Sequence, residues 1–376
     1  VITLAAVHAL VMYSIKPYGY NMSSMIRISQ NEKEGVVPEY FQKGMVIFED
    51  GGYDGQWYYY VAMDPLLTKG FYKNAYRQQR ILYPLTARLF AFGKESLLPY
   101  TLYIVNLTAL AIGMYFLILV LRQYSIHPLW SLFYGLSPSS IMTIQYDLPS
   151  PVSIAFIIIA IYFYTNKKVL LTAAFMALSF LTREDSIVVL LPLLIWDYQC
   201  NRQAKRIILL MSCLIPFFLW QFYITYRLGD TPLMTSAGVI SFIPFSGIIR
   251  YVKTLEVGGI KQILRQFSIL VVISYLIILS IIIIKKLLYI RQLFYYVIAA
   301  YCMLSVFFFP PPNSIHVIEY NGLMRAFYGL FPFMIFAYCI EKDRLIKGSI
   351  YFAGVLSFLT VIRILFISPV YPFTIW

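Results

Sequence analysis

The chain has 376 residues, of which 60% are hydrophobic and 12% are charged, and its formal net charge is +13. This composition excludes a soluble globular domain, and without a soluble basic domain we expect no nucleic-acid partner. Apolar runs close to the roughly 20 residues of a transmembrane helix recur along the chain, so we expect an integral membrane protein.

The apolar runs predict an all-α polytopic membrane protein with about eleven transmembrane helices, forming one integral membrane domain over residues 1–376. No small-residue cleavage site follows the first run, so we expect no cleavable signal peptide. The predicted spans cover about residues 1–15, 97–121, 129–146, 150–165, 168–182, 186–197, 207–226, 267–284, 292–309, 325–340 and 349–366.

Lys and Arg set the expected orientation. They concentrate in alternate short connections, whereas the connections between these are nearly free of them. The positive-inside rule places the basic connections in the cytoplasm and two long segments on the extracytoplasmic side. The first long segment contains an apolar run at 81–92 that is too short to span and predicts an interfacial or re-entrant helix. The basic connections contain residues 122, 167–168, 202–206, 285–291 and 342–347, and the long segments are 16–96 and 227–266.

The sequence FEDGGYDGQWYYYVAMDP, at residues 48–65, places carboxylates and glycines among aromatic residues. Asp54 has two compatible interpretations: a turn or cap before a helix over residues 56–63, or a catalytic acid. Asp50 is either a second acid or a plain loop charge. Asp64 precedes Pro65 and predicts the end of the same helix.

Ionisable residues near the predicted outer face are the other candidates, because charged groups beside a membrane are costly and usually functional. A carboxylate there can accept a proton from a hydroxyl that attacks an anomeric carbon. Arginine can hold a departing phosphate through paired hydrogen bonds, and Tyr and Trp present flat faces to sugar rings. The ionisable candidates are Asp50, Asp54, Asp64, Arg80, Asp147, Arg183, Glu184, Asp185, Glu319 and Arg325.

The sequence GYDGQWYYYVAMDP, followed by RQQRILYPLTARLFAFG, resembles the first external loop of bacterial polytopic glycosyltransferases of the GT-C superfamily. The similar stretch runs from Phe48 to Gly93, and LTRED and RAFYGLFP agree with the superfamily's architecture farther along the chain. The resemblance implies inverting transfer of a sugar from a polyprenyl-phosphate donor to a glycan, lipid or protein acceptor. It implies an active site on the extracytoplasmic side of a bacterial inner membrane, with Asp54, or else Asp50, as the catalytic acid.

We expect three arginines, Arg80, Arg183 and Arg325, to bind the donor phosphate. Membrane anchoring is the alternative for Arg80 and Arg325, and a local salt-bridged turn with Glu184 and Asp185 is the alternative for Arg183. The expected sugar- or acceptor-binding residues are Tyr53, Gln56, Trp57, His316 and Glu319.

We expect no cofactor or disulfide, because the 4 Cys and 3 His residues are scattered along the chain. A divalent metal stays an alternative, with His316 and Glu319 as its two candidate ligands, but two residues do not make a metal site. Two other functions are compatible with the sequence. One is a transporter or flippase of lipid-linked saccharides, and the other is a polysaccharide polymerase that relies more on external arginines than on a first-loop acid.

Overall fold

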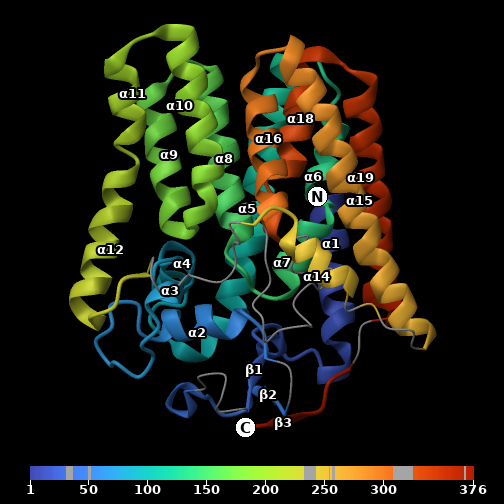
Figure 1. The fold of residues 1–376 in the computed structure, drawn as a ribbon. Helices are drawn as coiled ribbons and strands as arrows, with labels where there is room; N and C mark the ends of the chain where they lie inside the picture. Colours follow the sequence, from blue (N-terminus) through green and yellow to red (C-terminus); the bar gives the residue numbers. More distant parts are fainter. Residues whose placement is uncertain are drawn as a thin grey trace.

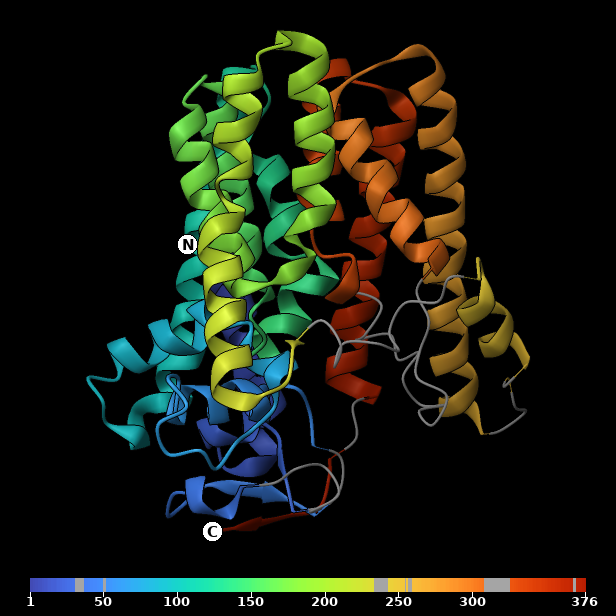
Figure 2. The same cartoon turned by 60° about the vertical axis from the view of Figure 1, so that its left-hand side comes forward.

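The computed structural model of the chain is mostly helical (Figure 1). The strands and the short helices of the first long segment lie at one end of the molecule. The connection between α10 (Ile187–Asn201) and α11 (Ala204–Met211) lies at the other end (Figures 1 and 2). The structure describes residues 1–30, 37–49, 52–232, 243–253, 255, 259–307, 325–367 and 370–376.

Four helical segments in these described ranges are long and apolar enough to cross a membrane. They contain 23 to 29 residues. At about 1.5 Å per residue, each exceeds the roughly 30 Å of a bilayer core. The segments are Glu95–Gln123, which comprises η5 (Glu95–Leu97) and α5 (Leu98–Gln123); Ala204–Leu228, which comprises α11 and α12 (Leu214–Leu228); Gln262–Tyr289 within α15 (Ile260–Tyr289); and Arg344–Phe366, which comprises α19 (Arg344–Ile362) and most of the π-helical η8 (Arg363–Ile367).

The prediction of about eleven spans is therefore wrong. Helices form at most of the predicted places, but six of them contain only 12 to 16 residues. Such helices measure about 18–24 Å and are shorter than a bilayer core. These six are α1 (Ile2–Ile15), α8 (Ser150–Thr165), α9 (Val169–Thr182), α10, α16 (Leu293–Phe307) and α18 (Leu330–Glu341).

The predicted span over residues 129–146 is broken into η6 (Pro128–Ser131), α6 (Leu132–Gly135) and α7 (Pro138–Gln145). Pro138 occupies the start of α7, and the Ser137 hydroxyl accepts a hydrogen bond from the amide of Ser140 at 3.2 Å. Proline cannot donate a helical hydrogen bond and suits the first turn, while serine is a favourable N-cap. A new helix therefore begins inside a continuous apolar run.

The helices pack around α5, which contacts α8, and α8 in turn contacts α9. On the other side of the bundle, α16 contacts α15 and α18, and it also contacts α10 of the first group. Figure 1 shows α8 to α12 grouped on one side and α15 to α19 on the other. The buried residues form two hydrophobic clusters, the larger of which joins α1, α5 and both helix groups.

A small sheet departs from the all-α expectation. Its strands are β1 (Ile28–Ser29), β2 (Val46–Phe48) and β3 (Phe373–Ile375), with β1 parallel and β3 antiparallel to β2. Trp376 extends the pairing, because its amide donates to the Met45 carbonyl and its own carbonyl accepts from the Gly44 amide. The last described residues are thus hydrogen bonded to the first long segment, a contact between distant parts of the sequence.

The first long segment contains the short helices expected for it. Gly55 begins α2 where no side chain fits, because a Cβ there would lie 2.6 Å from the Tyr146 carbonyl oxygen and 2.8 Å from that of Ile26. This close approach fixes the start of α2 against the rest of the fold. The helices are η1 (Lys16–Tyr18), η2 (Met22–Met25), η4 (Pro38–Tyr40), α2 (Gly55–Met63), α3 (Ala75–Gln78) and α4 (Leu82–Phe90), and α14 (Ser246–Lys253) lies in the second long segment.

Asp64 ends α2, as predicted. Its carboxylate accepts hydrogen bonds from the amides of Thr68, Lys69 and Gly70 at 2.7–3.0 Å, and from the Thr68 hydroxyl at 2.8 Å. Burial alone would raise the pKa of Asp64, but these hydrogen bonds outweigh it and lower the pKa below its ordinary value. Asp64 therefore holds the loop after α2.

Candidate active site

Asp54 occupies the N-cap position of α2, but its side chain does not cap the helix. Instead, Arg77 Nη2 donates to Asp54 Oδ1 at 2.8 Å, and Arg325 Nη1 donates to Asp54 Oδ2 at 2.5 Å. Burial alone would raise the pKa of Asp54, but the positive charges of Arg77, Arg325 and Arg80 outweigh it and hold the pKa well below its usual range. Asp54 is therefore a carboxylate held between two guanidinium groups.

Local structure places these groups. The Tyr53 amide donates to the Arg27 carbonyl at 3.0 Å, and the Tyr53 ring packs on Tyr146 with centroids 4.5 Å apart. Arg77 lies on α3, whose first turn is capped by a 3.0 Å hydrogen bond from the Arg77 amide to Asn74 Oδ1. Both sides of the Asp54–Arg77 pair are thus fixed by backbone contacts.

Arg80 is buried, with 5% of its side chain exposed, and it binds other protein groups rather than a free cavity. Its Nε donates to Glu184 Oε2 at 2.8 Å, and its Nη2 donates to Glu184 Oε1. Nη1 donates to the Tyr58 hydroxyl at 2.7 Å, and Nη2 also donates to the Tyr76 hydroxyl at 2.6 Å. Every nitrogen of the Arg80 guanidinium is therefore engaged, and Arg80 links the first long segment to the α9–α10 connection.

Arg183 follows α9 and forms an ion pair with Asp185 two residues later, as in the local salt-bridged turn that was the alternative to phosphate binding. Its Nε and Nη2 donate to the two carboxylate oxygens of Asp185 at 3.0 and 2.7 Å, and Nη1 donates to Ser150 Oγ at 2.5 Å. Glu184, which lies in the short helix η7 (Glu184–Ser186), turns away from this pair toward Arg80.

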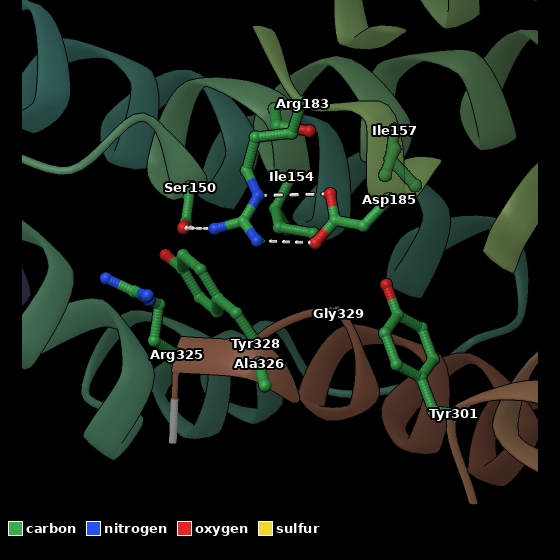
Figure 3. A pocket seen from close by; sticks show the side chains of 11 residues that line it. Ser150, Ile154, Ile157, Arg183, Asp185, Tyr301, Arg325, Ala326, Tyr328 and Gly329 are labelled. Carbon is green, nitrogen blue, oxygen red and sulfur yellow. Dashed lines mark hydrogen bonds and ion pairs between the residues drawn. The ribbon is translucent and has the colours of Figure 1, made fainter. Parts of the chain in front are cut away.

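A small pocket of about 10 Å³, room for about one water molecule, lies between Arg183 and Arg325. Figure 3 shows Arg183 pointing toward Ser150 and Asp185 from one side, whereas Arg325 lies on the other side with Tyr301 and Tyr328 and turns its guanidinium outward. Arg325 therefore lines the pocket and also donates to Asp54.

The structure thus brings together Asp54 and Arg80 from the first long segment with Arg183 and Arg325 from two later parts of the sequence. Tyr53 borders the site, because the Arg325 guanidinium lies 5.9 Å from its ring centroid. Three predicted site residues, Asp50, His316 and Glu319, lie outside the described residues.

The other two predicted substrate-binding residues contact the protein. Gln56 is buried, and its Oε1 accepts a hydrogen bond from the Ser29 amide at 3.2 Å. Trp57 is half-buried and stacks on Tyr72 with ring centroids 5.7 Å apart. Gln56 therefore anchors α2 to β1, whereas Trp57 keeps part of its surface accessible.

Arg77 is a site residue that the candidates chosen from the sequence did not include, whereas Glu184 was among them without its partner Arg80 being predicted. Arg77 precedes Arg80 by three residues, a spacing that places two side chains on one face of a helical turn. That spacing was the available signal, but the two guanidiniums bind different carboxylates. The pairing of Glu184 with Arg80 had no comparable local signal, because the two residues lie 104 positions apart.

The charges of the site nearly balance. Four arginines, at 77, 80, 183 and 325, face three carboxylates, at 54, 184 and 185, so these described groups carry one net positive charge. No group of three or more His, Cys, Asp or Glu side chains placed to hold a metal ion occurs in the described part of the chain. The arrangement can therefore bind an anion of single charge next to a carboxylate.

No protein-family model matches the chain, and no curated protein matches it significantly.

Proposed function

We propose that the protein is a membrane-embedded, inverting glycosyltransferase that moves a sugar from a polyprenyl-phosphate donor to an acceptor hydroxyl. The observation that carries this proposal is the position of Asp54 between Arg77 and Arg325, beside the pocket that Arg325 shares with Arg183. A base and an anion site adjoin there, as transfer from a phosphate leaving group requires.

The proposed membrane orientation follows from the charge distribution. The site lies at the end of the bundle where the strands and α2 to α4 lie, and the basic α10–α11 connection lies at the opposite end (Figure 1). The positive-inside rule then places the site on the extracytoplasmic side of the membrane. The proposed membrane is the inner membrane of a bacterium. Polyprenyl phosphate can present a sugar on that side, where nucleotide sugars are not available.

Asp54 is the proposed general base. Its carboxylate accepts the proton of the acceptor hydroxyl while the hydroxyl oxygen attacks the anomeric carbon from the face opposite the phosphate. The new glycosidic C–O bond forms as the bond to the phosphate oxygen breaks, and polyprenyl phosphate leaves. Attack from the opposite face inverts the anomeric configuration.

Arg183 and Arg325 are the proposed phosphate ligands, because guanidinium groups form strong, charge-assisted hydrogen bonds with phosphate oxygens. A sugar joined to a polyprenyl phosphate is a phosphodiester with a single negative charge, which matches the one net positive charge of the site. Arg80 instead takes a positioning role in the proposal, because it does not line the pocket and its nitrogens bind Glu184, Tyr58 and Tyr76.

Donor binding tests the assignment of the phosphate ligands. We expect Arg183→Gln and Arg325→Gln each to weaken binding of a polyprenyl phosphate to the purified protein about 10–100-fold. This range corresponds to the loss of about 1.5–3 kcal/mol for a charged hydrogen bond. The matched control is Arg122→Gln, because Arg122 is exposed near the end of α5 farthest from the first long segment. Equal affinity in all three variants and the wild type would reject both arginines as ligands.

A further inference from the structure

We propose that Arg77 and Arg325 hold Asp54 in an inactive state, and that the donor phosphate activates it by drawing Arg325 away into the pocket beside Arg183. This inference rests on the proposed function and adds a regulatory step to it. The consequence is an ordered reaction, in which the base becomes competent only after the donor has bound.

Both oxygens of Asp54 are occupied in the structure. One accepts from Arg77 and the other from Arg325, and these arginines come from positions 23 and 271 residues away along the chain. A carboxylate paired with two positive charges is a weak proton acceptor, because each charge stabilises the ionised form. A base in this state cannot accept a hydroxyl proton at the rate that transfer needs.

Arg325 is the partner that can move. Among the described residues, its hydrogen bonding is to Asp54, and 27% of its side chain is exposed. Arg183 and Arg80 are each held by a carboxylate and at least one hydroxyl group. Within the described part of the chain, an incoming anion therefore displaces fewer protein contacts at Arg325 than at either of the other two.

The pocket toward which Arg325 would turn adjoins its present position, and it must widen beyond its room for about one water molecule to admit a phosphate. Arg325 lines the pocket that contains Arg183, Ser150 and Tyr301 (Figure 3). A phosphate placed there would face the guanidiniums of Arg183 and Arg325. Arg325 would then donate its hydrogen bonds to the phosphate in place of the Asp54 carboxylate, while still lining the pocket. Arg77 would stay on Asp54 and keep the carboxylate in position.

The ionisation of Asp54 reports this exchange. Among the described residues, the charged groups that act on Asp54 are Arg77, Arg80 and Arg325, and Tyr72 lies close enough to sense its charge. Removing one of the arginines should raise the pH at which Asp54 takes up a proton by about one unit or more. Carbodiimide labelling with mass-spectrometric peptide mapping measures this pH, since the reagent reacts with protonated carboxyl groups.

We expect saturating farnesyl phosphate, a prenyl phosphate without a sugar, to shift the Asp54 labelling midpoint upward by about one pH unit or more. Arg325→Gln should give a similar upward shift without any lipid, and farnesyl phosphate should add little to it. Arg325→Lys, which keeps the charge, should resemble the wild type. The exposed side chain of Asp230 gives an internal reference on the same protein.

An unchanged midpoint in the wild type, at lipid concentrations that saturate binding, would overturn the inference. So would an Arg325→Gln midpoint equal to that of the wild type. These results differ from a failure of the proposed function. Sugar transfer with no shift would remove the activation step and leave the glycosyltransferase, whereas a shift with no transfer from any sugar donor would keep the arginine exchange and remove the enzyme.

Discussion

Asp54→Asn is expected to lower the rate of sugar transfer by about 10²–10⁴-fold, the usual contribution of a general base. The asparagine amide has nearly the same shape as the carboxylate but cannot accept the hydroxyl proton. Donor binding should be unchanged or tighter, because Arg77 and Arg325 lose their shared anion and become available to phosphate. Initial rates of transfer and donor affinity, measured on the same preparation, check both parts.

Asp230→Asn is the matched control for this variant, because Asp230 is an exposed aspartate outside the cluster. It should transfer sugar at the wild-type rate. An Asp54→Asn protein that retains more than about a tenth of the wild-type rate would remove Asp54 as the base.

Arg80→Leu is expected to lower the free energy of unfolding by about 2–4 kcal/mol. The substitution leaves the Glu184 carboxylate without its ion pair, and loss of one partner from a buried pair usually costs about 3–5 kcal/mol. The expected value is somewhat smaller because 28% of the Glu184 side chain is exposed and can bind water. Unfolding in mixed detergent micelles, followed by circular dichroism, gives the measurement.

A double-mutant cycle separates the ion pair from the volume change at position 80. Arg80→Leu combined with Glu184→Leu should be more stable than Arg80→Leu alone, because no unpaired carboxylate remains. If Arg80→Leu unfolds like the wild type but loses donor binding, Arg80 contacts the phosphate directly and its positioning role is wrong.

Hydropathy predicted where most helices lie but not how far each extends. The expected segment 150–165 coincides with α8, whereas 129–146 is divided by Pro138 and its Ser137 cap. An apolar run contains little information on helix ends, which depend on single capping residues and on tertiary contacts. The strand β3 was missed for a similar reason, because its three residues form a strand by pairing with β2, more than 300 positions earlier.

The sequence predicted which types of residue form the candidate site, but it did not predict which of them pair with one another. Asp54, Arg183 and Arg325 were selected because charged groups near apolar spans are costly. Their partners depend on packing between distant segments: Arg325 reaches Asp54 across 271 positions, and Arg80 reaches Glu184 across 104. No local pattern distinguishes Arg80, which the protein engages fully, from Arg325, which also lines a pocket.

The most direct test of the proposed enzyme follows both products of the reaction. The purified wild-type protein in liposomes, given polyprenyl-phosphate sugars of known structure and candidate acceptors, is predicted to release one polyprenyl phosphate for each glycosidic bond formed with inverted configuration. Movement of intact donor across the bilayer, with no glycosidic bond formed from any donor, would contradict the enzyme and favour a carrier of lipid-linked saccharides.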